Sequence, residues 1–68
     1  MNATQQVEEL ARRSAHGIDV SLLWDRAIGD LTVSVHDART GDYFELPAHP
    51  GNALDVFNHP FAYADARP

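Results

Sequence analysis

One six-residue pattern, Asp-x-x-x-Gly-Asp, occurs twice in the sequence and limits strongly how the chain can fold. The first copy spans residues 25–30 and the second spans residues 37–42. In a four-residue hairpin loop, the first aspartate can cap the turn with its side chain, and glycine supplies the positive φ that ends it. Two such loops in succession predict three antiparallel strands joined as a meander.

The segments around these loops alternate apolar and polar residues, as half-buried strands do. We expect strands at 18–25, 30–37 and 42–47, with Pro47 ending the third. If Asp25 faces Asp30 and Asp37 faces Asp42, every large apolar side chain of the strands except Leu23 and Tyr43 falls on one face. The two loops and the alternation therefore predict the same sheet.

Both flanks of the sheet are predicted to be helical. Residues 3–16 carry a narrow apolar stripe at helical spacing, and Glu8–Arg12 and Glu9–Arg13 are favourable pairs four residues apart. Gly17 stands where a left-handed C-terminal cap would lie. We expect a short second helix at residues 52–58, which ends before His59-Pro60. Residues 65–68 are expected to form a frayed tail.

The predicted fold is a single α+β domain over residues 1–68. It is a three-stranded antiparallel meander in the order 1-2-3, with an N-terminal helix and a short C-terminal helix. The N-terminal helix could pack on its own sheet or on a second chain. The expected core is one cluster from all predicted strands and the second helix: Val20, Leu22, Val33, Val35, Phe44, Leu46, Leu54 and Phe57.

Size and charge narrow the classes of function. A 68-residue chain without cysteine has no disulfides to supplement a small core, which favours burial against a second chain. The net charge of −5 argues against a nucleic-acid backbone binder. The absence of a long apolar run and of a signal peptide predicts a cytoplasmic protein that does not enter membranes. Arginine without lysine, with abundant alanine, is typical of a GC-rich, bacterial genome.

Catalytic and metal-binding signals are weak. The four histidines, His16, His36, His49 and His59, have no spacing typical of metal ligands. Ser21 and Ser34 would face each other on the polar side of the sheet, with His36 close by, but no nucleophile elbow accompanies them. We therefore predict no catalytic residue, no metal site and no cofactor.

The predicted interaction residues are Leu23, Trp24, Phe61 and Tyr63. Strand 18–25 would be an edge of the meander, and its segment 21–24 carries neither charge nor proline, so we expect it to pair with a copy of itself or with another protein. Phe61 and Tyr63 make the C-terminal segment aromatic, as interface cores often are. The alternative is that this segment closes over the open end of the sheet.

These patterns favour a small non-enzymatic interaction or regulatory module. We expect a homodimer, a complex with a partner protein, or both. The alternative function is a small ligand- or metal-binding protein that uses its surface histidines.

Overall fold

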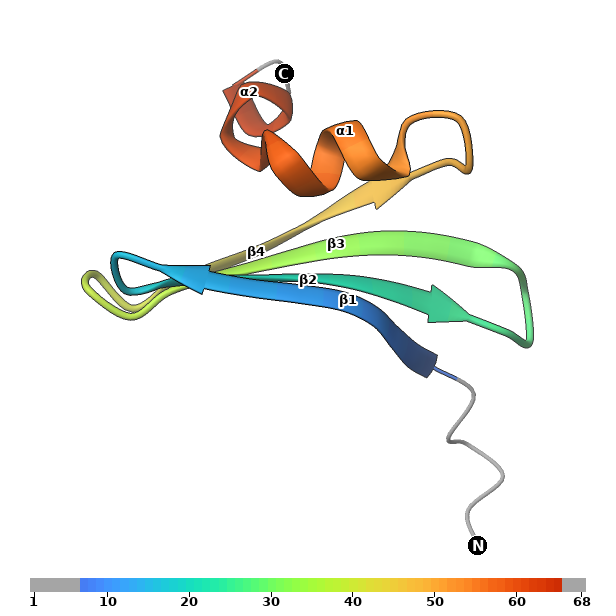
Figure 1. Cartoon of the computed structure of the whole chain (residues 1–68), viewed down its shortest axis with the longest axis horizontal. Coiled ribbons are helices and arrows are strands. Elements are labelled where there is room, and N and C mark those ends of the chain that lie inside the picture. Colours follow the sequence, from blue (N-terminus) through green and yellow to red (C-terminus); the bar gives the residue numbers. More distant parts are fainter. Residues whose placement is uncertain (1–6, 66–68) are drawn as a thin grey trace, which may run out of the picture.

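The computed structural model describes residues 7–65, which form a four-stranded antiparallel sheet and two short helices. The strands follow one another in space in the order β1-β2-β3-β4, and both helices lie on the same face of the sheet (Figure 1). The elements are β1 (Val7–Ala15), β2 (Ile18–Asp25), β3 (Asp30–Asp37), β4 (Asp42–Ala48), α1 (Ala53–Asn58) and α2 (Pro60–Asp65). The fold is thus a two-layer α+β arrangement.

The two repeated turns have the predicted geometry. Asp25 pairs with Asp30 and Asp37 pairs with Asp42. In each turn a carboxylate Oδ1 accepts a hydrogen bond from the backbone N–H two residues on, at 3.0 Å for Asp25 and 2.9 Å for Asp37. The glycines at 29 and 41 have φ of 77° and 81°. The predicted strands at 18–25 and 30–37 and the register between them are confirmed.

The predicted N-terminal helix is wrong. Residues 7–15 form the strand β1, which pairs with β2, and residues 3–6 of that prediction lie outside the described part of the chain. The sheet therefore has four strands instead of three, and β2 is an interior strand instead of an edge. The helices of the described residues all follow the sheet.

Backbone pairing explains why β1 is extended. A narrow apolar stripe offers a helix little burial, whereas pairing satisfies the otherwise unpaired N–H and C=O groups along β2. His16 and Gly17 have φ of 55° and 80°, which suits the two-residue hairpin turn that joins β1 to β2. Gly17 has the expected positive φ, but it serves this turn and not a helix cap. The three- and four-residue apolar spacing is absorbed by a bulge between Glu9 and Ala11.

The two real edges of the sheet carry features that discourage strand addition. On β1 these are the bulge and four charged residues, Glu8, Glu9, Arg12 and Arg13. On the opposite edge Pro47 pairs with Thr32 within β4, which runs one residue beyond the predicted end. The expectation that an unprotected strand 18–25 pairs with another chain loses its basis, because β1 occupies that edge.

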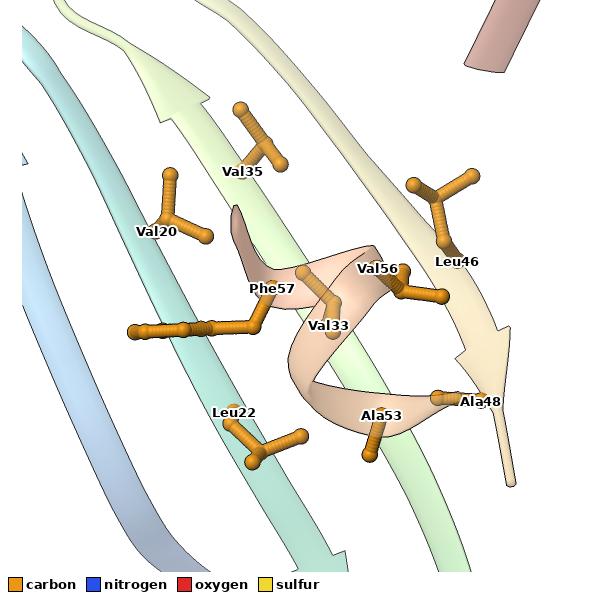
Figure 2. Close-up of a cluster of buried hydrophobic side chains, with 9 residues drawn as sticks. All are labelled: Val20, Leu22, Val33, Val35, Leu46, Ala48, Ala53, Val56 and Phe57. Atoms are coloured by element: carbon orange, nitrogen blue, oxygen red, sulfur yellow. The ribbon is translucent and has the colours of Figure 1, made fainter. Parts of the chain in front are cut away.

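The core lies between α1 and the sheet, and Figure 2 shows it. Six of the eight predicted core residues are buried, and Phe44 packs against them half-buried. Leu54 is the exception, because its side chain is 67% exposed while Val56 is fully buried. The buried apolar residues are Val20, Leu22, Val33, Val35, Leu46, Ala48, Ala53, Val56 and Phe57.

The C-terminal segment forms a second helix, which the sequence patterns did not predict. The first helix ends at Asn58, and Pro60 begins α2, a position where proline's fixed φ and missing N–H suit a helix. Phe61 meets the ring of Phe44 edge-on, with centroids 5.7 Å apart. Asp65 is the last residue of α2, and residues 66–68 of the predicted frayed tail lie outside the described range.

Two hairpin turns are fastened together at one end of the sheet. The Ala38 N–H donates to the Gly17 carbonyl at 2.8 Å. The Arg39 side chain crosses Gly17 and forms a two-pronged ion pair with Asp37, in which Nε lies 3.0 Å from Oδ1 and Nη2 lies 2.9 Å from Oδ2. We call this region, made of residues 15–18 and 37–42, the turn end.

Gly17→Ala should destabilise the protein more than Gly29→Ala. Both glycines have positive φ, which costs any other residue about 1 kcal/mol. A Cβ at Gly17 would also stand 2.9 Å from Arg39 Cγ, whereas a Cβ at Gly29 meets nothing within 4 Å. Urea denaturation of the two variants measures the difference. Equal losses of unfolding free energy would contradict this packing.

The ion pair at the turn end predicts a loss of stability in acid. The hydrogen bonds from Arg39 lower the pKa of Asp37 to about 2. In the unfolded chain this carboxyl titrates at about 3.9. The stability that the ion pair adds to the folded state is therefore complete above that pH and is lost as the pH falls toward about 2. Asp37→Asn should flatten the fall in unfolding free energy across this window. Asp25→Asn, at the matching position of the other repeated turn, should keep the wild-type steepness, and equal behaviour of the two variants would contradict the assignment.

Candidate functional site

The two helices cover only part of the sheet. The first helix packs on β2, β3 and β4, and α2 packs on α1 and β4. In Figure 2 the Phe57 side chain reaches over β2, while β1 lies farther out. Along β1 only Ala11 is even half-buried. The helix side of the β1–β2 hairpin is therefore one part of the sheet that a ligand or a partner can approach.

A groove of about 350 Å³ opens between this hairpin and the helices, next to the turn end. Its floor comes from β1 and β2, and its wall comes from the end of α1 and the start of α2. Its lining residues are Arg13, Ala15, His16, Ile18, Val20, Asn58, His59, Pro60, Phe61 and Ala62. We call this feature the groove.

Arg13 joins the two sides of the groove. Its Nη2 donates to the Phe57 carbonyl at 2.8 Å and to the Asn58 carbonyl at 3.3 Å, and its Nε lies 3.3 Å from the former oxygen. The guanidinium carbon also stands 5.4 Å from the centre of the Phe57 ring. A cation beside the last carbonyls of a helix is favourably placed. The groove thus has a fixed guanidinium at its rim.

The groove differs in charge from the chain as a whole. Arg13, His16 and His59 line it, and no acidic residue is found among its described lining. The whole chain has ten acidic and five basic residues. Cationic and hydrogen-bonding side chains are thus concentrated around an apolar floor of Ile18 and Val20.

The other end of the sheet is apolar and exposed. Seven large hydrophobic side chains of the described residues are exposed, and five of these belong to the first half of β1, the end of β2, the 26–29 turn and the first turn of α1. Figure 1 shows the start of β1, the 26–29 turn and the start of α1 at the same end of the sheet. Val7, Leu23 and Ile28 line a shallow depression of about 300 Å³ there. We call this surface the apolar end; it consists of Val7, Leu10, Leu23, Trp24, Ile28 and Leu54.

Strand register explains why these side chains lie at the same end of the sheet, on its two faces. Val7 pairs with Asp25, the last residue of β2, and Ile28 belongs to the turn that follows. Trp24 points to the helix side of the sheet, opposite Leu31, whose other partner is Ala48 at the end of β4. Since α1 begins shortly after β4 ends, its first turn carries the exposed Leu54 to the same end.

Acidic residues border the apolar end. Asp25, Asp30 and Glu45 line the same depression as Val7, Leu23 and Ile28. Arg26 lies nearby, and its Nη1 is 3.9 Å from Glu8 Oε1 on the exposed surface. An apolar centre with a charged rim is the usual composition of a protein interface.

The predicted interaction residues divide between different surfaces. Leu23 and Trp24 belong to the apolar end but point to opposite faces of the sheet, because neighbours in a strand alternate. Phe61 lines the groove, and Tyr63 packs against the core and donates a hydrogen bond to Asp55. The Asp55 contact raises the pKa of Tyr63. The structure therefore does not gather these four residues on one surface.

The serines and histidines considered for chemistry are also separated. Ser21 and Ser34 pair across β2 and β3 as expected, yet no serine bonds to a histidine within residues 7–65. Ser14 donates to Asp19 instead, and Tyr43 donates to Glu45, which raises the pKa of the tyrosine. No group of three or more histidine or acidic side chains among the described residues is arranged to hold a metal ion.

Comparisons with known proteins add no identification. No protein-family model, curated protein or solved structure matches the chain. None of the helices in the described residues has the length and apolar character needed to cross a membrane.

Sequence reasoning missed the groove and most of the apolar end. Arg13 and His16 were assigned to a helix, so they were not expected opposite the second helical segment. The local signal for their true position is the pair His16-Gly17, because a two-residue loop that ends in glycine commonly joins the two strands of a hairpin. Ile28 could have been found as the one large apolar residue within a repeated turn.

Proposed function

We propose that this chain is a non-enzymatic protein-interaction module that forms a homodimer through its apolar end. The observation that supports the proposal most directly is the exposure of five large apolar side chains in one region of a very small domain. Soluble monomers seldom leave a sizeable contiguous apolar patch in contact with water.

The size of the molecule makes such an interface energetically useful. Its accessible surface is 4693 Å², and a specific interface covers about 800 Å² per partner, close to a sixth of it. A domain of this length without disulfides gains little net stability from its own core. Covering Ile28 and Leu54, which are 68% and 67% exposed, removes apolar surface that folding alone leaves in water.

The same surface also constrains how two copies would meet. Strand addition at β1 is discouraged by its bulge and charges, so we place the contact on side chains at the end of the sheet and not on backbone groups. Two copies that meet at this surface bring their acidic rims together. Because each chain also carries a net charge of −5, the two copies repel each other. Salt screens this repulsion. Dimer formation should therefore strengthen as the salt concentration rises, whereas a basic partner protein would bind more weakly.

Ile28→Lys and Leu54→Lys should each shift the wild-type dimer toward monomer. Both side chains are exposed, so the fold should tolerate the change, while a lysine introduced into an apolar contact opposes association. Sedimentation velocity at two salt concentrations measures the shift. Ala38→Lys is the matched control, because Ala38 is exposed at the turn end and should leave the dimer unchanged.

A wild-type chain that sediments as a monomer at high micromolar concentration in both salts would overturn the homodimer. So would a dimer that Ala38→Lys disrupts and the two variants at the apolar end do not.

A further inference from the structure

We propose that the groove is a second, independent binding site, and that it takes a small molecule with an apolar body and a carboxylate head. This site lies at the turn end and goes beyond the proposed function, which concerns the apolar end. The carrying observation is the placement of Arg13, His16 and His59 around an apolar floor, with no acidic residue among the described lining.

The groove has the size and composition of a small-molecule site. Ligand pockets usually have volumes of about 300–1,000 Å³ and combine an apolar lining with a few polar groups that fix orientation. The volume here is about 350 Å³, and most of the lining residues are apolar. The floor of Ile18 and Val20 and the ring of Phe61 suit a short alkyl or aryl body.

The polar groups around the groove select a carboxylate head. Guanidinium is a donor that binds carboxylates with directed hydrogen bonds. The described hydrogen bonds of Arg13 use Nε and Nη2, and none of them uses Nη1. Imidazole donates a hydrogen bond to a carboxylate in either protonation state and adds a positive charge when protonated.

Arg13 is also held in place before a ligand arrives. Its contacts with the Phe57 and Asn58 carbonyls and with the Phe57 ring fix the guanidinium at the junction of sheet and helix. A donor that is already ordered loses little conformational freedom on binding. A single guanidinium and two imidazoles match one negative charge better than a phosphate monoester, which carries close to two charges and a more strongly hydrated head.

Titration of the full-length, ¹⁵N-labelled chain with hexanoate tests the proposal. Amide shifts should saturate at millimolar concentrations and concentrate in residues 13–20 and 57–62, which border the groove. Hexanamide has the same body without the charge and should bind at least about three-fold more weakly, and hexylamine should cause no saturable shifts there.

Variants of the two histidines test the assigned head group. His59→Gln and His16→Asn should each weaken hexanoate binding by about two- to five-fold while the remaining amide spectrum stays unchanged. Asparagine is chosen at position 16 because it tolerates the positive φ found there. His49→Gln, at an exposed histidine outside the groove lining, is the matched control and should bind as the wild type does.

Three results would overturn the proposal. They are equal affinity for hexanoate and hexanamide, saturable shifts that fall at the apolar end instead of the groove, and a loss in His49→Gln equal to that in the groove variants. None of these results depends on whether the chain dimerises.

Discussion

The hydrogen bond from each turn aspartate to its own loop is the interaction on which the rest of this structure depends. Asp25 and Asp37 each accept a backbone N–H at about 3 Å, and the glycine four residues later closes the loop with a positive φ. Because side chains alternate along a strand, a slip of one residue would turn every core side chain toward water. The two turns therefore decide which face of the sheet the helices must cover.

The helices are too short to cover that face completely. Two helices of six residues each lie over β2, β3 and β4, and the helix side of β1 stays open. A distinct surface lies at each end of the sheet. At the turn end Arg13 spans the gap and a groove with a cationic rim remains, whereas at the other end apolar side chains lie exposed. The groove follows directly from this incomplete cover.

Local signals were sufficient to predict β2, β3, their register and most of the core, because the turns and the alternation are encoded within a few residues. They failed for β1, where helix spacing and ion pairs were real but pairing along β2 outweighed them. Leu54 shows a second limit. In a helix of six residues, a shift of one position decides whether Leu54 or Val56 is buried, and only packing on the sheet settles it. Of the predicted site residues, Leu23 and Trp24 reach the apolar end, while the groove joins residues about 45 positions apart that no local pattern connects.

The central claim is that the apolar end is the surface for self-association. A dilution series of ¹H–¹⁵N spectra tests it most directly, because it reports association residue by residue. The account predicts concentration-dependent amide shifts in residues 7–10, 23–29 and 53–55, with residues 15–18 and 38–41 unchanged. Spectra independent of concentration, or shifts confined to the turn end, would contradict it.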